Sequence, residues 1–216
     1  MNEFLAHEIA YRGNELVIEN RASKQIKILG AGALGSWLTD LLARQGYQGL
    51  TVVDFDKVER GNFGTQNYGS LDVGRSKASQ LAHNVIRRLG VRVVPITKRV
   101  TDVNINSVIG GADLVIDLFD NVESRRVVKE ACTKKSISCL HGGLGSVGYF
   151  EAKWNEGYFI PDKNPNPTDI PCDYPLASNL VMLCVGAIAE VVNRFFDEQK
   201  KLGIEFWLES MKMELG

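Results

Sequence analysis

The sequence predicts one α/β domain of 216 residues, in which a mostly parallel sheet carries helices on both faces. Two apolar runs without alternation, Leu50–Asp54 and Asp113–Leu118, are typical of parallel strands that are covered on both sides. Segments with helical spacing lie between such runs. The repeated order of strand and helix therefore favours a parallel sheet.

The segment Gln25–Gly35, QIKILGAGALG, begins as an apolar strand, passes through glycines and continues into a helical pattern. In this GxGxxG context, Gly30 permits the tight turn, Gly32 lets a phosphate approach the backbone, and Gly35 lets the helix pack on the strand. Free N–H groups at the helix start attract an anion. The segment predicts a Rossmann-like nucleotide-binding fold, a fold that many chemistries share.

The remaining elements follow from hydrophobic periodicity. Residues 1–24 are a lead-in that is either helical or extended. We expect helices near 34–45, 77–88 and 124–134, a short helix or turn at 103–109, and strands at 25–29, 91–96 and 136–140. After residue 141 the pattern changes to a partly alternating strand at 147–154, a long helix at 176–200 and a terminal edge strand, or less favoured helix, at 204–214. These last strands predict an antiparallel C-terminal extension.

Composition limits the function classes. The net charge is −1, so no basic excess points to nucleic acid or a membrane surface. The N-terminus lacks the pattern of a signal peptide, and the most apolar stretch, Leu176–Phe196, carries polar residues that suit a buried helix. We therefore expect a cytoplasmic protein. Its four cysteines form no CxxC pair, which argues against a zinc ribbon.

Polar residues are expected where the parallel strands end, which is where ligands bind in such sheets. Besides the glycine turn, these residues are Asp54, Asp120 and His141. Asp54 lies about 20 residues beyond the glycines, the spacing of an acid that holds a ribose. A nicotinamide-dependent oxidoreductase would share these features, but it leaves the polar segment 55–77, and within it the loop from Asn62 to Lys77, unexplained.

That segment carries the most specific motifs. The string VVDFDKVERGNFGTQ, followed by VGRSKA and DLVIDLFDNVESR, resembles the HesA/MoeB/ThiF family of ubiquitin-activating-enzyme-like adenylyltransferases. The family pattern is a glycine loop, D-x-D-x-V, N-x-x-R-Q, G-x-x-K and D-N-x-x-x-R. The resemblance covers about residues 25–200.

The resemblance implies adenylation of a small ubiquitin-like or sulfur-carrier protein by ATP and Mg²⁺, in a homodimer. The nucleotide-binding residues that it implies are Gly30, Gly32, Ala33, Gly35, Asp54, Asp56, Asn62, Lys77, Asp120 and Asn121. The catalytic residues would be Asp120, which would also hold Mg²⁺, with Lys77, Asn62, Gln66 and Cys172. Cys172 lies in segment 155–175, which has five of the six prolines, no period, and the place of the family's crossover loop.

The chain departs from the family pattern at Thr65, which stands where the family has an arginine. The N-terminal R-x-x-R-Q motif is not recognisable either. Arg12, Arg60, Arg75 or a partner chain are candidates for the replacement charge. A nucleotide-binding but catalytically weak partner subunit is therefore the alternative function.

Several residues have plain structural interpretations. Asp120 would suit a helix N-cap, and Lys77 a surface lysine. His141 is expected to be a packing residue, and Arg125 a structural residue that ties the Asp120 turn. Cys132, Cys139 and Cys184 are expected in the core.

Overall fold

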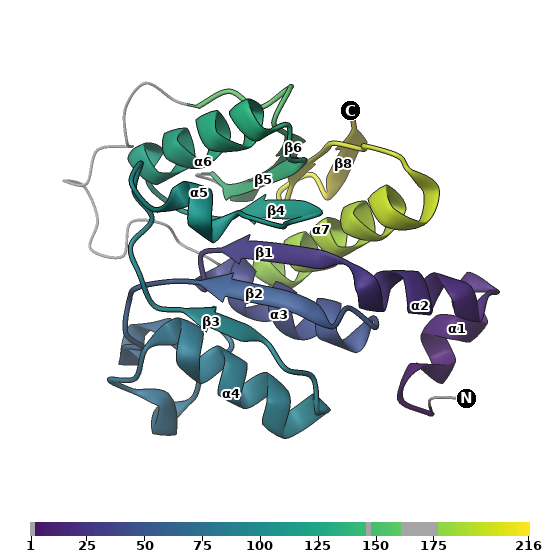
Figure 1. The fold of residues 1–216 in the computed structure, drawn as a ribbon, viewed down its shortest axis with the longest axis horizontal. Helices are drawn as coiled ribbons and strands as arrows, with labels where there is room; N and C mark the ends of the chain where they lie inside the picture. The colour runs from purple at the N-terminus through teal and green to yellow at the C-terminus, as the bar shows by residue number, and fades with distance from the viewer. Residues whose placement is uncertain (1–2, 146–147, 161–176) are drawn as a thin grey trace.

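The computed structural model describes residues 3–145, 148–160 and 177–216. Within them, the strands form a sheet in the order β3-β2-β1-β4-β5-β6-β7-β8 (Figure 1). Their bounds are β1 Gln25–Leu29, β2 Gly49–Val53, β3 Val94–Ile96, β4 Leu114–Asp117, β5 Cys139–Leu144, β6 Tyr149–Trp154, β7 Ile204–Trp207 and β8 Lys212–Leu215. Strands β1 to β5 pair in parallel, whereas β5 to β8 pair antiparallel. The predicted fold class, with its antiparallel C-terminal extension, is confirmed.

Helices cover both faces of the sheet. On one face the core is formed with α3 (Ala33–Arg44), α4 (Lys77–Leu89) and α7 (Ser178–Glu198). On the other face it is formed with α5 (Ile105–Val108) and α6 (Val122–Lys135). Successive residues of β1 show the alternation, because Ile28 joins the first core and Leu29 joins the second.

The N-terminal lead-in is helical. It consists of η1 (Glu3–Leu5), α1 (Ala6–Arg12) and α2 (Glu15–Ser23). Arg21 fixes it to the body, because its fully buried guanidinium forms ion pairs with Glu8 at 3.1 Å and with Asp197 of α7 at 2.5 Å. Figure 1 shows α1 and α2 at the end of the sheet where β1 begins.

Three predicted boundaries were wrong. Strand β3 begins only at Val94. Strand β5 continues through the glycines after His141, because Gly142 and Gly143 pair with Ala152 and Glu151 of β6. The C-terminal segment is a hairpin of β7 and β8 instead of one strand, since a turn at 208–211 reverses the chain with Met211 at φ +52°.

Helix α7 is long and apolar enough to cross a membrane by length and composition alone. Most of that stretch is buried, and its side chains pack with those of α3 and of the sheet. It is therefore the buried helix that its polar residues predicted.

Candidate functional site

The glycine turn between β1 and α3 has the geometry that the motif predicts. Gly30 has φ +102°, and a Cβ there would lie 2.9 Å from the carbonyl oxygen of Leu118. A Cβ on Gly35 would lie 1.9 Å from the carbonyl oxygen of Gly30, so only glycine lets the helix start so close to the strand. A Cβ on Gly32 would meet no atom within 4 Å. Open space therefore lies beside Gly32, next to Ala33 at the start of α3.

Asp54 braces this turn from the end of β2. Its Oδ2 accepts a hydrogen bond from the Ala31 N–H at 2.7 Å, and its Oδ1 accepts one from the Asp56 N–H at 2.8 Å. Burial raises the pKa of Asp54, although these two N–H groups and the charge of Lys77 oppose the rise. Each carboxylate oxygen has a second lone pair, so the predicted ribose contact remains chemically open.

Lys77 begins α4 beside the same edge. Its Nζ lies 3.6 Å from Oδ2 of Asp56, and its side chain is 11% exposed. Tyr68 joins Lys77 to the glycine turn, because its hydroxyl lies 2.9 Å from the carbonyl oxygen of Ala31 and 3.3 Å from that of Lys77. The lysine is thus held at the site and is not a free surface residue.

The loop after β2 folds over α3. The Asn62 Oδ1 accepts a hydrogen bond from the Glu59 N–H at 2.8 Å, which closes the short helix η2 (Arg60–Asn62). The Trp37 indole donates to the carbonyl oxygen of Thr65 at 3.0 Å. The Gln66 Oε1 is buried without a hydrogen-bond partner, and such an orphaned polar atom is unusual in a folded protein.

The turn that carries Asp120 lies against the glycine turn. The Leu118 N–H donates to the carbonyl oxygen of Leu29 at 2.8 Å, which joins β4 to the end of β1. Asp120 is exposed, and Asn121 is the N-cap of α6, with its Oδ1 accepting from the Ser124 N–H at 2.9 Å. The N-cap interpretation of Asp120 was therefore wrong, and the Asp120 carboxylate is not used by the helix. Among the residues that the structure describes, no group of three or more His, Cys, Asp or Glu side chains could hold a metal ion.

Other sequence candidates lie elsewhere. Arg12 forms an ion pair with Glu190 of α7 at 2.8 Å. His141 lies within β5 and is fully buried, so its placement at a strand end was wrong, whereas its interpretation as a packing residue agrees with the structure. Arg125 is structural, but it donates to the carbonyl oxygen of Gly142 at 2.8 Å and does not tie the Asp120 turn.

Three of the four cysteines lie among the described residues. Cys132, Cys139 and Cys184 are buried free thiols, as predicted. Burial raises the pKa of the Cys184 thiol to about 12, so this thiol stays neutral. Cys172 and most of the 155–175 segment lie outside the described residues.

Sequence reasoning missed Tyr68 and Trp37 as supports of the site. It also missed Arg99, whose guanidinium lies 4.2 Å from the centre of the Phe55 ring, just beyond β2. No spacing rule signals these contacts, because each joins segments that only the sheet order brings together. The available hint was that Tyr68 and Phe55 are aromatic residues between predicted elements.

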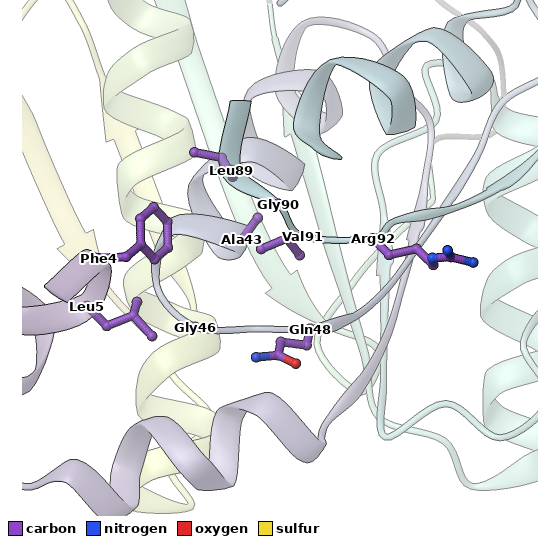
Figure 2. A pocket seen from close by; sticks show the side chains of 9 residues that line it. All are labelled: Phe4, Leu5, Ala43, Gly46, Gln48, Leu89, Gly90, Val91 and Arg92. Carbon is purple, nitrogen blue, oxygen red and sulfur yellow. The ribbon is translucent and has the colours of Figure 1, made fainter. Parts of the chain in front are cut away.

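A separate cavity of about 400 Å³ lies at the opposite ends of α3 and α4 (Figure 2). Its lining comprises Phe4, Leu5, Ala43, Gly46, Gln48, Leu89, Gly90, Val91 and Arg92. Figure 2 shows the Arg92 guanidinium pointing away from the cavity. Since Ala33 and Lys77 mark the starts of these two helices, the cavity is distinct from the glycine turn.

A parallel sheet with a braced glycine turn and a lysine at one strand-end edge defines a Rossmann-like nucleotide-binding protein. The sequence matches the ThiF family over residues 10–194. The chain belongs to the ThiF family, whose related members are E1-like adenylyltransferases.

Curated relatives agree with this family. The SAMP-activating enzyme E1 of Haloferax volcanii is 36% identical over 125 residues, which are 56% of this chain and 46% of that protein. The molybdopterin-synthase adenylyltransferase of Salmonella typhimurium is 29% identical over 153 residues, which are 68% and 59%. The sulfur carrier protein ThiS adenylyltransferase of Bacillus subtilis is 35% identical over 128 residues, which are 56% and 38%. Each match spans less than two thirds of the relative's own length.

Solved structures show the same fold. E. coli MccB, crystallised with ATP, covers 100% of this chain with 71% of its own, with a TM-score of 0.83 and 16% identity. PaaA covers 93% of this chain with 75% of its own, with a TM-score of 0.76 and 17% identity. At these identities the likeness concerns the fold alone.

Proposed function

We propose that the chain adenylates the C-terminal carboxylate of a small ubiquitin-like or sulfur-carrier protein. A carboxylate oxygen of the carrier attacks the α-phosphorus of ATP. The bond from that phosphorus to the bridging oxygen breaks, and pyrophosphate leaves with the electron pair. The products are an acyl-adenylate and pyrophosphate. Such a reaction depends mainly on position and on neutralisation of charge.

One observation carries the proposal: the glycine turn, Lys77 and the Asp120 turn meet at a single edge of the sheet. Tyr68 and Asp54 hold the first two together, and Leu118 joins the third to β1. The open space beside Gly32 would receive a phosphate, because helix α3 starts there and its free N–H groups attract anions. The Lys77 ammonium would add a positive charge to the same anion.

The residues present also fit a magnesium ion. Mg²⁺ is usually held by one or two carboxylates together with substrate phosphates, and Asp120 is an exposed carboxylate beside the turn. Asp120 would hold the ion, which when bound neutralises charge on the triphosphate. Asn121 keeps this carboxylate at the start of α6 by capping that helix.

Thr65 supports a second candidate function. Without the family's arginine, the loop offers the triphosphate less positive charge than its relatives do. Arg60 and Arg75 are exposed in the same loop, whereas Arg12 is paired with Glu190. A nucleotide-binding subunit that needs a second protein for full activity is therefore the alternative.

The carrier protein and the assembly remain part of the proposal. Relatives named for a SAMP or a ThiS carrier suggest a small carrier here as well. We propose a cytoplasmic homodimer. Light scattering, which gives the molar mass in solution, would test the dimeric state. Acyl transfer to Cys172 is a further step, in which the thiolate attacks the acyl-adenylate, AMP leaves and a thioester forms. A thiol-labile carrier adduct that is lost in Cys172→Ala would support it.

Two measurements test the function. A calorimetric titration with ATP and Mg²⁺, beside one with NADH, should show saturable binding of ATP. Exchange of pyrophosphate into ATP should then require both Mg²⁺ and a candidate carrier that ends in Gly-Gly.

The matched control is Asp120→Ala, which removes an exposed side chain and should leave the fold intact. Exchange by the wild-type chain no faster than by this variant would refute adenylation. Tight ATP binding without exchange, restored by a second protein, would instead favour the partner-subunit function.

A further inference from the structure

A run of buried hydrogen bonds lies behind the Asp120 turn. Asp117, the last residue of β4, pairs with His141 across the sheet, and both side chains are fully buried. The Oδ2 of Asp117 lies 2.8 Å from Nδ1 of His141, while its Oδ1 accepts a hydrogen bond from the Phe119 N–H at 3.1 Å. Asp117 thus holds the turn that leads to Asp120 from inside the sheet.

The other end of the run is Asn155, directly after β6. Its Nδ2 lies 2.7 Å from the hydroxyl of Thr133 and 3.4 Å from the carbonyl oxygen of Lys129. The Thr133 hydroxyl donates its hydrogen to that same carbonyl oxygen at 2.8 Å, so it only accepts from Asn155. This fixes the Asn155 amide with its nitrogen toward α6 and its Oδ1 toward His141.

These partners fix where the imidazole protons lie. The Nε2 of His141 is 2.7 Å from the Asn155 Oδ1, which has no hydrogen to give, so Nε2 carries one. A second proton lies between Nδ1 and the Asp117 carboxylate. The pair is then an imidazolium beside a carboxylate, with no net charge to bury.

The groups around the imidazole act on its charge in both directions. The Tyr158 ring stacks on the imidazole at 4.2 Å with 9° between the planes, a geometry that favours a cationic ring. Cys139 Sγ lies 3.4 Å from Nε2, and burial raises the pKa of that thiol, so it adds no charge. The neighbouring cations of α6, Arg125 and Lys129, contact Tyr158, and their charges oppose a cationic ring, so the Asp117 carboxylate is the group that balances it.

From this geometry we infer that His141 is a positioning residue for the Asp120 turn. It carries a proton on each ring nitrogen, is held by Asn155, and keeps Asp117 aimed at the Phe119 N–H. The turn from Leu118 to Asn121 therefore depends on a contact made after β6, far away in the sequence. The use of this turn by ATP rests on the proposed function, whereas the two ring protons do not.

Nuclear magnetic resonance of the full chain, with ¹⁵N-labelled histidine, tests the ring protons. The other two histidines, His7 and His83, are exposed, and their ring protons exchange quickly with water. We expect two slowly exchanging ring N–H signals from a single histidine. One such signal, or none, would overturn the inference.

The variant Asn155→Ala tests the positioning. Asn155 is only half-buried, so its truncation should leave the protein folded, and Asn106→Ala on the exposed side of α5 is the matched control. Hydrogen exchange of the Phe119 amide should become about three- to tenfold faster in Asn155→Ala, the effect of one hydrogen bond, and should not change in Asn106→Ala. Equal exchange in the two variants would overturn the inference.

The kinetics of pyrophosphate exchange give a separate test of the positioning role. If the wild-type chain exchanges pyrophosphate, Asn155→Ala should raise the KM for ATP in the presence of Mg²⁺ more than it lowers kcat, because the displaced turn binds the nucleotide. An inactive wild-type chain would refute the proposed function. The ring N–H signals and the hydrogen exchange of the Phe119 amide would still decide the role of His141. Unchanged KM in an active Asn155→Ala protein would count against positioning.

Discussion

The Tyr68 hydroxyl donates a hydrogen bond to the carbonyl oxygen of Ala31 at 2.9 Å, which ties the long loop after β2 to the glycine turn. Tyr68 is 8% exposed, and burial raises the pKa of its phenol, so the hydroxyl keeps its proton at any pH of interest. The contact joins residues that lie 37 positions apart. The shape of the proposed phosphate site thus depends on a side chain outside every recognised motif.

Replacing Tyr68 by Phe should loosen the glycine turn. The Ala31 carbonyl would lose its buried donor, which lowers the free energy of unfolding by about 1–2 kcal/mol. Affinity for ATP should fall as well. Urea unfolding and calorimetry check both effects, with Tyr11→Phe, whose residue is 80% exposed, as the control. Equal stability of the two variants would show that the Tyr68 bond is not important.

The substitutions Gly32→Ala and Gly35→Ala should separate binding from folding. At Gly35 the new Cβ would meet the Gly30 carbonyl oxygen at 1.9 Å, so we expect a loss of about 3 kcal/mol or more of stability. At Gly32 the methyl group meets nothing, and stability should change by less than about 1 kcal/mol. ATP affinity should nevertheless drop about tenfold, since the methyl group takes up the proposed phosphate space.

Thermal unfolding and ATP titration of both variants measure this contrast. If Gly32→Ala binds ATP as tightly as the wild type does, the phosphate does not bind beside this turn. A stable Gly35→Ala protein would contradict the close approach of helix and strand.

Asp54→Asn should change how stability depends on pH. Burial raises the pKa of Asp54 in the folded protein, so the folded state holds this proton more tightly than the unfolded state. The stability that the proton contributes is fully present below about pH 4, the unfolded value, and is lost as pH rises through the folded pKa. The asparagine side chain of the variant does not titrate, so the variant lacks this contribution at every pH.

The free energy of unfolding of both proteins, measured by urea at a series of pH values, gives the difference curve. The wild-type advantage should shrink as pH increases from about 4 upward. At neutral pH the remaining difference should be about 1–3 kcal/mol in favour of wild type, because asparagine offers only one accepting oxygen to two N–H groups. A wild-type advantage that is independent of pH, or that grows with pH, would show that burial does not raise the pKa of Asp54 in the folded protein.

Thr65→Arg should strengthen ATP binding by restoring a positive charge to the loop. The backbone oxygen of Thr65 accepts from Trp37, so the side chain is replaced without loss of that bond. We expect the Kd for ATP to fall about two- to fivefold, the size of one partly exposed charge contact. Thr65→Gln adds length without charge and should have no such effect. The gain should disappear at about 1 M salt, where charge contacts are screened.

Local features of the chain were predictable. Strand β1 and the start of α3 follow from an apolar run, three glycines and a helical period, and the structure confirms them within one residue. Helix α4 was placed as closely, because its apolar face and its closing glycine, Gly90, are properties of neighbouring residues. The bounds of β5 and of the β7–β8 hairpin were not predictable, since they depend on which strand lies alongside.

The candidate site also has a part that was predictable from the local sequence and a part that was not. Gly30 and Gly35 were found from spacing, because each acts through its own place in the turn or the helix. Lys77 was named from the resemblance to the family, and its phosphate contact stays a prediction. The structural alternative for Asp120, a cap of α6, was wrong because Asn121 is the cap, and a shift of one residue at a helix start is set by the backbone path.

By itself, the sequence determined the order of the elements and the glycine turn, because steric demands of glycine and hydrophobic periodicity act between near neighbours. Its spaced motifs indicated the family by resemblance, and the match over residues 10–194 shows it. The tertiary structure decided that Tyr68 reaches Ala31 and that His141 links Asn155 to Asp117. Those pairs are adjacent only because β1 lies between β2 and β4, and β5 between β4 and β6. Buried hydrogen bonds between distant segments are fixed by the order and register of the sheet, and no local pattern in the chain encodes that order.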